Sequence, residues 1–302
     1  MSASTMVIRS TAGMWRQACI MAGAVQPTVP AAGPAPWLLP GSPVEWPRVG
    51  PVVHCWRSML PSLSIVIPAY NEAASIEASV REALEVGAAH AGALEVIVCD
   101  DASRDETRAI AAAIAARDPR VVVVHRGQNR GIEASMRALY AQARHAWVFL
   151  NSADRQWPMT VLAPMATAAE AGADFVIGVR SNKREVYTPY RRLISWSYER
   201  VVRALGAPGG DPGSVKLARR ELLHRAVVAR GVFAEGERVI RAARGGARVV
   251  EVPVEFHRRG AGKATGARRD VVVRAIVDVA RVGASLALGA PAPQLPVPDV
   301  ER

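Results

Sequence analysis

Three short apolar segments of this sequence are each followed by acidic side chains. The segments and their acidic residues are 63–67 with Glu72, 94–99 with Asp100 and Asp101, and 147–150 with Asp154. Carboxylates accept hydrogen bonds from ribose hydroxyls and from base N–H groups. Together with diphosphate oxygens they also hold Mg²⁺ or a similar hard cation. The pattern therefore predicts a site for a nucleoside diphosphate that carries a group to be transferred.

Strands that alternate with single helices must position these side chains. The expected strands are 63–67, 94–99, 121–124, 147–150 and 175–179, and the expected helices are 73–86, 105–117 and 131–143. Ser103 or Asp105 is expected to cap the second helix. The alternation is typical of βαβ units and predicts an α/β fold, with a mostly parallel sheet flanked by helices. Ligands of such sheets bind beyond the carboxyl ends of the strands, where the acidic residues stand.

The second half of the chain is less regular. Its expected elements are helices over 190–205, 235–244 and 270–288 and a strand over 248–254. In the last helix the polar residues Asp270, Arg274, Asp278 and Arg281 form one narrow stripe. We expect its remaining apolar face to pack on the sheet, with docking at a lipid interface as the alternative. No apolar run of the sequence is long enough to cross a bilayer.

Arginine dominates the charge of this chain. The formal net charge is +11, and Lys183, Lys216 and Lys263 are the only lysines. Either composition bias explains the arginines, or they bind a partner with phosphates or an anionic membrane surface. No zinc finger or recognition-helix pattern is present, so nucleic acid is not an expected partner. The three scattered cysteines exclude a disulfide framework and indicate a reduced compartment, which predicts a cytoplasmic protein.

The first 60 residues differ in composition from the rest. They are rich in proline and show no sustained hydrophobic period, which predicts a disordered arm over 1–60. Met59 is an alternative start of the protein. One domain is expected over 61–290, with a nucleotide-binding half to residue 160 and an acceptor-binding half from 161, followed by a flexible tail over 291–302.

Four sequence motifs of this domain resemble those of the family 2 glycosyltransferases, which are inverting enzymes of GT-A fold. Among them, the chain is most similar to the polyprenol-phosphate sugar synthases related to dolichol-phosphate mannosyltransferase. The matching residues are Ile65-Val66-Ile67-Pro68-Ala69-Tyr70-Asn71-Glu72, Val98-Cys99-Asp100-Asp101-Ala102-Ser103-Arg104-Asp105-Glu106-Thr107, Asn129-Arg130-Gly131 and Asp154-Arg155-Gln156-Trp157-Pro158. Their order and spacing make the combination specific.

The resemblance implies a nucleotide-binding role for the first two motifs. Pro68, Tyr70 and Glu72 would line the nucleoside pocket, and Asp100 or Asp101 would bond the base or the ribose. An aromatic ring beside the base and carboxylates beside hydroxyls suit this role. The alternative is that Asp101 only shapes a turn beside a helix cap.

The metal motif departs from the family pattern. The family places Asp-x-Asp after its fourth strand, where this chain has Ser152-Ala153-Asp154, so Asp154 and the following Gln156 match and Ser152 replaces the first acid. The resemblance implies Mg²⁺ or Mn²⁺ at Asp154, and one carboxylate with diphosphate oxygens and waters suits either cation. We expect weaker metal binding than with two acids. The alternative function is a nucleotide-sugar-binding protein with impaired catalysis.

Basic residues downstream resemble the family's phosphate-binding segments. Arg191 and Ser195 are four residues apart on one predicted helix face and would clamp an acceptor phosphate together with Arg180. Arg258, Arg259 and Lys263 would form a lid over the sugar diphosphate. The alternative for the helix is an ordinary solvated basic face.

The mechanism implied by the resemblance is transfer of a sugar from a UDP- or GDP-sugar with inversion. The catalytic set comprises Asp154, Gln156, Arg180, Asp211 and Glu237. An acceptor phosphate, as in polyprenyl phosphate, is already an anion and needs no base. A hydroxyl acceptor on a glycan or a small metabolite would need Asp211 or Glu237 as the base. A lipid acceptor implies peripheral contact with the inner face of the membrane.

Overall fold

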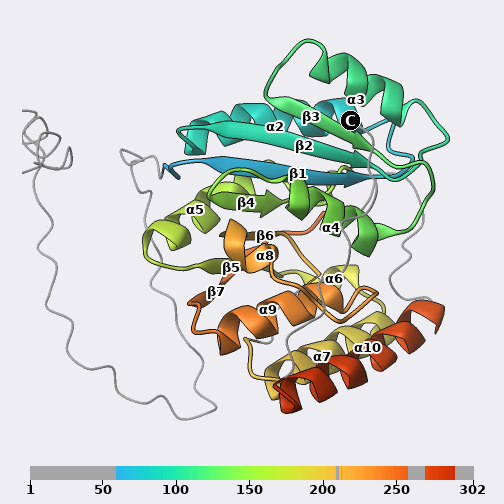
Figure 1. Cartoon of the computed structure of the whole chain (residues 1–302), viewed down its shortest axis with the longest axis vertical. Helices are drawn as coiled ribbons and strands as arrows, with labels where there is room; N and C mark the ends of the chain where they lie inside the picture. Colours follow the sequence, from blue (N-terminus) through green and yellow to red (C-terminus); the bar gives the residue numbers. More distant parts are fainter. Residues whose placement is uncertain (1–58, 209–210, 212, 258–268, 290–302) are drawn as a thin grey trace, which may run out of the picture. The chain divides into compact units, whose positions relative to one another are not determined.

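The described residues form one sheet with helices on both faces (Figure 1). The computed structural model describes residues 59–208, 211, 213–257 and 269–289, all within one compact unit, His54–Arg302. The sheet has the strand order β3-β2-β1-β4-β6-β5-β7. Its strands are β1 (Leu63–Ala69), β2 (Leu94–Asp100), β3 (Val121–His125), β4 (Trp147–Leu150), β5 (Phe175–Arg180), β6 (Lys216–Arg219) and β7 (Val249–Val254). Of the expected arm over 1–60, residues 1–58 lie outside the described residues, whereas Leu60 is described and buried; the expected tail over 291–302 also lies outside them.

The order of the strands creates a switch point between β1 and β4. From β1 the chain adds β2 and β3 on one side, and then returns to place β4 on the other side of β1. β1 is parallel to both neighbours, with Ala69 beside Asp100 and Val66 beside Leu150. β6 is antiparallel to β4 and to β5, whereas β7 is parallel to β5. The sequence prediction of a mostly parallel α/β sheet flanked by helices is confirmed, and the short β6 is a strand that is absent from the expected elements.

Helices cover the two faces of the sheet in separate groups. One group comprises α2 (Ile76–His90), α3 (Thr107–Ala115) and α5 (Leu162–Glu170), and it packs in one hydrophobic cluster. The other group packs in a second cluster and comprises α4 (Ile132–Gln142), α7 (Pro189–Ala204), α8 (Arg220–Leu223), α9 (Ala234–Arg244) and α10 (Arg269–Ala287). A short α6 (Lys183–Val186) lies between β5 and α7, and a 3-10 turn (Met159–Val161) precedes α5.

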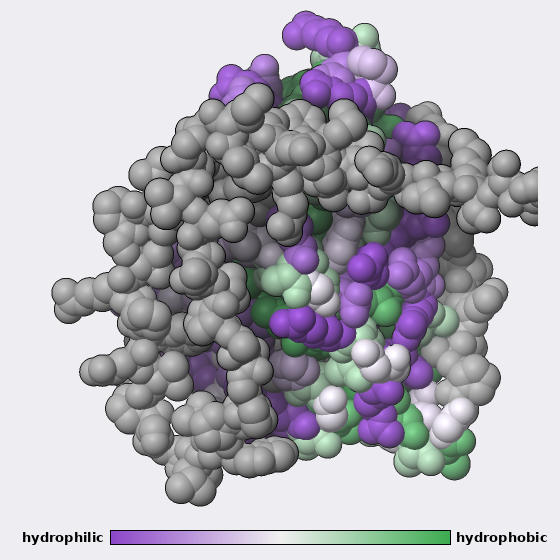
Figure 2. All heavy atoms as spheres, turned by 90° about the vertical axis from the view of Figure 1, so that its left-hand side faces the viewer, coloured by the Kyte–Doolittle hydropathy of each residue, from purple (hydrophilic) through white to green (hydrophobic). Residues whose placement is uncertain are grey.

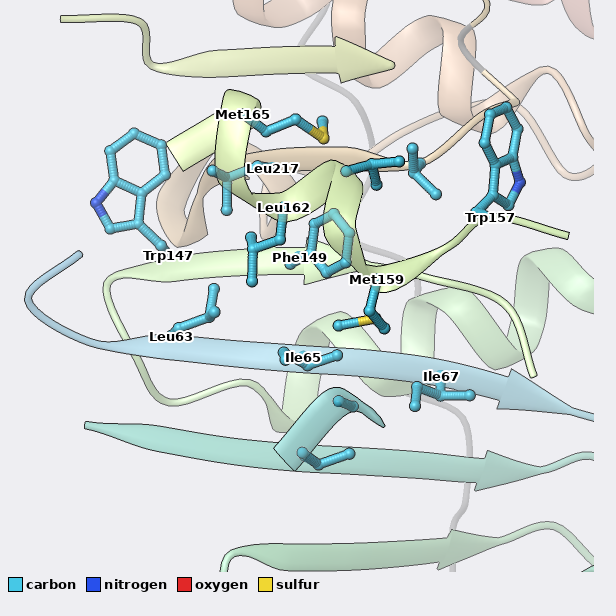
Figure 3. Packing of buried hydrophobic residues seen from close by; sticks show 14 of the residues in the cluster. Leu63, Ile65, Ile67, Trp147, Phe149, Trp157, Met159, Leu162, Met165 and Leu217 are labelled. Atoms are coloured by element: carbon cyan, nitrogen blue, oxygen red, sulfur yellow. The ribbon is translucent and has the colours of Figure 1, made fainter. Parts of the chain in front are cut away.

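Alternation along the central strands separates the two clusters. Leu63, Ile65 and Ile67 of β1 face the first cluster, where they pack with Phe149 of β4, and Val66 faces the second. Figure 3 shows the first cluster filling the space between β1, β4 and α5. Successive side chains of a strand point to opposite faces, so a strand buried on both faces is apolar throughout. This explains why the sequence predicted these strands well.

The last helix, α10, does not fit its prediction. Asp278 and Val282 point inward, with 2% and 0% of their surface exposed, whereas Val273 and Ile276 are 60% and 65% exposed. The expectation that the whole apolar face packs on the sheet is therefore wrong. Asp278 faces inward because its carboxylate accepts hydrogen bonds from the backbone N–H groups of Arg230 and Gly231. In the part of the chain that the structure describes, no helix combines the length and apolar character needed to span a membrane.

Candidate active site

The loops after β1 and β2 are tied into one wall at the carboxyl edge of the sheet. Asn71 has a left-handed backbone (φ 55°), its N–H donates to Ser103 Oγ at 2.9 Å, and its Oδ1 accepts from the N–H of Arg104 at 2.8 Å. The N–H of Glu72 donates to Thr107 Oγ1 at 2.8 Å. The cap position of the helix that begins at Thr107 is Glu106, so neither Ser103 nor Asp105 is its cap residue. Asp105 does accept a hydrogen bond from the N–H of Thr107, at 3.1 Å.

The predicted nucleoside residues of β1 lie along this wall. Pro68 borders a cleft, and Tyr70 is 41% exposed. The Glu72 carboxylate accepts a hydrogen bond from Ser75 Oγ at 3.0 Å. The structure thus places all three at the carboxyl end of β1, although Pro68 alone of them lines the cleft.

Asp100 and Asp101 are buried and hold neighbouring loops. Asp100 accepts from the N–H of Ser103 and contacts His125 Nδ1 at 2.8 Å. Asp101 accepts from the N–H of Arg130 at 3.1 Å and of Gly131 at 2.8 Å, immediately before α4 begins. A carboxylate at this position also interacts favourably with the positive end of the helix dipole. Asp101 therefore fixes the start of α4 rather than only its own turn.

The loop after β4 carries the predicted metal residue. Ser152 Oγ donates to Asp154 Oδ1 at 2.5 Å, and the N–H of Gln156 donates to the same oxygen at 3.2 Å. Gln156 also exchanges two hydrogen bonds with the backbone of His257, so the end of β7 lies beside this loop. The serine that replaces the family's first acid thus orients the remaining carboxylate.

These residues suit a weakly held divalent cation. Among the described residues, no three His, Cys, Asp or Glu side chains form a group that could hold a metal ion. Mg²⁺ in proteins is commonly bound by one or two carboxylates, with substrate phosphates and waters completing its shell. Asp154, with the Ser152 hydroxyl beside it, fits a cation that arrives with a diphosphate.

A cleft of about 210 Å³ opens at the switch point between β1 and β4. Its lining residues come from the ends of β1 and β4, the start of α4, the approach to β6 and the start of α9: Pro68, Ile132, Glu133, Met136, Leu150, Asn151, Ser152, Trp157, Gly213, Ser214, Val215, Lys216, Gly231, Val232 and Glu235. Mostly apolar walls with a few convergent polar groups are typical of small-molecule sites.

A buried ion pair that the sequence analysis missed lies in this cleft. The ammonium of Lys216, which is 0% exposed, pairs with Glu235. Glu235 also accepts from Tyr140 Oη at 3.0 Å and from Arg238 Nε at 3.2 Å. Burial by itself raises the pKa of Glu235, but Lys216 and Arg238 outweigh it and hold that pKa below its ordinary value. Burial lowers the pKa of Lys216. One signal was available, because Lys216 is one of only three lysines in an arginine-rich chain.

Glu133, at the start of α4, is a second missed cleft residue. Only 8% of it is exposed, and Oε2 pairs with Arg137. Its Oε1 has no hydrogen-bond partner among the described residues. Burial raises the pKa of this carboxyl above its ordinary value. Two carboxylates line the cleft, Glu133 and Glu235. Of these, Glu133 binds a proton, or accepts a hydrogen bond from a ligand, more readily.

The predicted acceptor residues form a cluster beside β5. Arg180 pairs with Asp211, and its guanidinium lies over Trp157 and Phe256, at 4.6 and 4.5 Å from the ring centroids. The structure thus brings Arg180 and Asp211 together.

Arg191 extends this cluster onto α7. Its guanidinium stacks on Tyr187 at 4.3 Å, and Tyr187 also lies beside Arg180 at 5.6 Å. Ser195 follows Arg191 by four residues on α7, and its hydroxyl donates to Glu199. The predicted lid residues Arg258, Arg259 and Lys263 lie outside the described residues.

Glu237 lies outside the cleft. It is fully buried, accepts from the backbone N–H groups of Val228 and Ala229, and pairs with Arg241. It therefore holds the loop that precedes α9. Glu235, two residues earlier, is the carboxylate of this segment that faces the cleft.

Comparisons with known proteins identify the family. The sequence model of glycosyl transferase family 2 matches residues 64–226, more than half of the chain. The chain belongs to this family. The family resemblance drawn from the four motifs is confirmed.

Similar curated proteins act on polyprenyl lipids according to their names. The chain is 32% identical over 169 residues to an undecaprenyl-phosphate 4-deoxy-4-formamido-L-arabinose transferase of Pseudomonas paraeruginosa, covering 55% of this chain and 49% of that protein. It is 30% identical over 214 residues to a polyprenol monophosphomannose synthase of Mycolicibacterium smegmatis, covering 66% and 78%. The chain thus spans about half the length of the first relative.

Solved structures share the fold. Glucosyl-3-phosphoglycerate synthase from Mycobacterium tuberculosis, crystallised with Mn²⁺, UDP and phosphoglyceric acid, superposes with a TM-score of 0.58 at 21% identity, covering 74% of this chain and 79% of that one. Mannosyl-3-phosphoglycerate synthase from Rubrobacter xylanophilus gives a TM-score of 0.58 at 19% identity, covering 78% and 79%. The GT-A fold is confirmed.

Proposed function

We propose that this protein transfers a sugar from a nucleoside-diphosphate sugar to polyprenyl phosphate, with inversion at the anomeric carbon. The observation that carries the proposal is the cleft at the β1–β4 switch point, bordered by Pro68 and Ser152 and adjoining the Asp154 loop. The names of the relatives support the lipid acceptor, and the Mn²⁺ and UDP of the structural neighbour support the donor class.

The donor binds along the carboxyl edge of β1, β2 and β4 in this proposal. Tyr70 and Glu72 contact the nucleoside. Asp100 and Asp101 either accept hydrogen bonds from the base or the ribose with their remaining lone pairs, or hold the loops that shape the nucleoside pocket. Asp154, oriented by Ser152, holds Mg²⁺ or Mn²⁺ together with the diphosphate. The cation, when bound, neutralises charge on the departing diphosphate. Binding of UDP compared with GDP distinguishes uracil from guanine as the base.

The state of the predicted bases favours a phosphate acceptor. Asp211 is paired with Arg180, and Glu237 is bound by two backbone N–H groups and Arg241. Carboxylate oxygens that already hold such partners are not placed to take a proton from an acceptor hydroxyl. A polyprenyl phosphate needs no base, because its oxygen attacks as an anion. Arg191 and Arg180 would orient that phosphate.

A hydroxyl acceptor is the second candidate, and Glu133 is the observation that favours it. Glu133 lines the cleft, its buried Oε1 has no hydrogen-bond partner among the described residues, and burial raises the pKa of its carboxyl. A general base works best when its pKa lies near the working pH. If the acceptor is a hydroxyl, Glu133→Gln abolishes turnover; if it is a phosphate, the isosteric variant keeps most of it.

The test uses the full chain with UDP- and GDP-sugars, Mn²⁺ or Mg²⁺, and polyprenyl phosphate. We expect steady release of nucleoside diphosphate only when polyprenyl phosphate is present. Release with glycans or small alcohols instead would favour the second candidate. Donor binding without turnover on any acceptor would contradict both and favour a nucleotide-sugar-binding protein.

A further inference from the structure

Two residues that line the cleft carry buried polar atoms without a partner in the protein. Glu133 and Ser214 both line it, and they are 8% and 2% exposed. Glu133 Oε1 and Ser214 Oγ have no hydrogen-bond partner among the described residues. Buried polar atoms of native proteins are nearly always hydrogen-bonded, because leaving one unpaired is costly. Two such atoms on residues of one cleft indicate a ligand that forms hydrogen bonds with them.

The charged side chains that line the cleft are already paired within the protein. Glu133 pairs with Arg137, and the buried Lys216 pairs with Glu235, which also bonds Arg238. A charged group of a ligand would therefore meet a charge of its own sign, or would take a counter-ion from one of these pairs. Breaking a buried pair is strongly unfavourable, because it leaves one charge uncompensated. The cleft thus suits a ligand group that has hydroxyls but no charge.

The other walls of the cleft are largely apolar. They are formed by Ile132, Met136, Leu150, Val215 and Val232. Apolar walls with a few polar groups hold a small molecule by its apolar surface and fix its orientation by hydrogen bonds. A pyranose offers both, since its ring C–H groups are apolar and its hydroxyls project from the ring.

The position of the cleft indicates which part of the donor it receives. Ser152 lines the cleft, and its hydroxyl donates to Asp154, the proposed cation ligand. A diphosphate bound at Asp154 therefore has its attached group at the cleft. In a nucleoside-diphosphate sugar that group is the sugar.

The acceptor phosphate suits a different place. Trp157 lines the cleft, and the guanidinium of Arg180 lies 4.6 Å from its ring centroid. An anion matches the cluster that contains Arg180 and Arg191, because guanidinium groups bind phosphate oxygens. The cleft instead carries the carboxylates of Glu133 and Glu235. The site therefore separates an anionic acceptor from an uncharged sugar.

We propose that the cleft selects an uncharged sugar from the donor, with Glu133 and Ser214 as the residues that bind its hydroxyls. The substrate class is a neutral pyranose, N-acylated sugars included, whereas uronates and sugars with a free amino group are rejected. Glu133 accepts a hydrogen bond from one hydroxyl, and Ser214 bonds another. The inference rests on the proposed function, because a nucleoside-diphosphate donor brings the sugar to this cleft.

The test is calorimetric binding of paired donors to the full chain, with Mn²⁺ and without an acceptor. The pairs are UDP-glucose with UDP-glucuronate and UDP-N-acetylglucosamine with UDP-glucosamine, or GDP-mannose with GDP-mannuronate if the chain binds GDP. We expect the neutral donor to bind at least about tenfold more tightly than its charged counterpart, since an unmatched charge in a buried site is strongly unfavourable. A charged donor that binds as tightly as its neutral counterpart overturns the proposal.

Two variants assign the selection to named residues. Ser214→Ala should weaken binding of the neutral donor about fivefold and leave binding of UDP or GDP alone unchanged. Its thermal stability should not fall, because the lost hydroxyl has no partner among the described residues. Glu133→Gln deprives Arg137 of its counter-ion, so discrimination against the uronate should fall about tenfold. In turnover this variant should raise the KM for the donor more than it lowers kcat, the reverse of losing a base.

Glu95→Gln is the matched control. Glu95 is also a buried carboxylate paired with an arginine, Arg144, but it lies at the start of β2, at the opposite edge of the sheet. In Figure 1 this edge is on the left, and Figure 2, which looks onto that side, shows hydrophilic side chains among hydrophobic ones. We expect the control to bind every donor like the wild type.

Three results overturn the assignment to the cleft. They are unchanged binding in both cleft variants, equal changes in Glu95→Gln, and a loss of kcat without a change of KM in Glu133→Gln. In each of them UDP or GDP still binds, so the proposed function stands. Absence of all nucleotide binding would instead contradict the proposed function, and the inference with it.

Discussion

Replacing Asp101 by asparagine separates its two candidate roles. As a ligand of the nucleoside alone, Asp101 could lose its charge without affecting the fold. In the structure its two oxygens accept from the N–H groups of Arg130 and Gly131, and Arg126 Nε lies 3.7 Å away. Arg126 is only 2% exposed. The variant Asp101→Asn keeps one acceptor, turns an amide N–H₂ toward the other backbone N–H, and leaves the Arg126 guanidinium without its counter-ion.

The magnitude follows from these contacts. A hydrogen bond to a charged group contributes about 1.5–3 kcal/mol, and breaking a buried ion pair adds to the loss. We expect Asp101→Asn to lower the free energy of unfolding by about 3 kcal/mol, which corresponds to a Tm lower by about 6 to 12 °C in a domain of this size. Nucleotide binding should weaken as well, because α4 begins at Ile132, which lines the cleft.

The assay is thermal unfolding with and without UDP or GDP, with Asp118→Asn as the matched control. Asp118 also bonds a backbone N–H and an arginine, Arg120, but at the surface. Its loss should cost less than about 1 kcal/mol. An Asp101→Asn variant as stable as the wild type that has lost only nucleotide binding would refute the structural role.

Two further predictions concern the charges of the cleft. Lys216→Met and Glu235→Gln should each lower the free energy of unfolding by about 3 kcal/mol, because each leaves a buried charge unpaired. The double variant should lose clearly less than the sum of the two. Additive losses in denaturant unfolding would mean that the pair is not coupled. The raised pKa of Glu133 means that the native state binds the proton more tightly, so its contribution to stability falls as the pH rises from about 4.5 through the native pKa. As the pH rises through this range, the Glu133→Gln variant should therefore become more stable relative to the wild type. A difference in unfolding free energy that does not change with pH would contradict a raised pKa of Glu133.

The sequence predicted best what depends on local patterns. The strands around Val66 and Phe149 are apolar on both faces, and their ends are marked by acidic residues that the fold brings to one edge. The family motifs lie at those same ends. Apolar runs bounded by polar residues carry this information in a single stretch of chain.

Contacts between distant segments were not predictable in the same way. The pairing of Lys216 with Glu235 and the capping of α4 by Asp101 depend on tertiary placement. β6 is four residues long and follows a loop, so it carries no period of its own. In α10 the polar stripe predicted that Asp278 faces outward, but the backbone N–H groups of Arg230 and Gly231, which are distant in sequence, hold its carboxylate inward.

In the proposed reaction, Asp154, oriented by Ser152, holds a divalent cation against the nucleoside diphosphate. The most direct test of this role is calorimetric binding of UDP and GDP, with and without Mn²⁺, to the wild type and to Asp154→Ala. We predict that Mn²⁺ strengthens binding of one of the two nucleotides to the wild type and has no such effect on a folded Asp154→Ala variant. An undiminished effect of Mn²⁺ in that variant would show that Asp154 does not hold the cation.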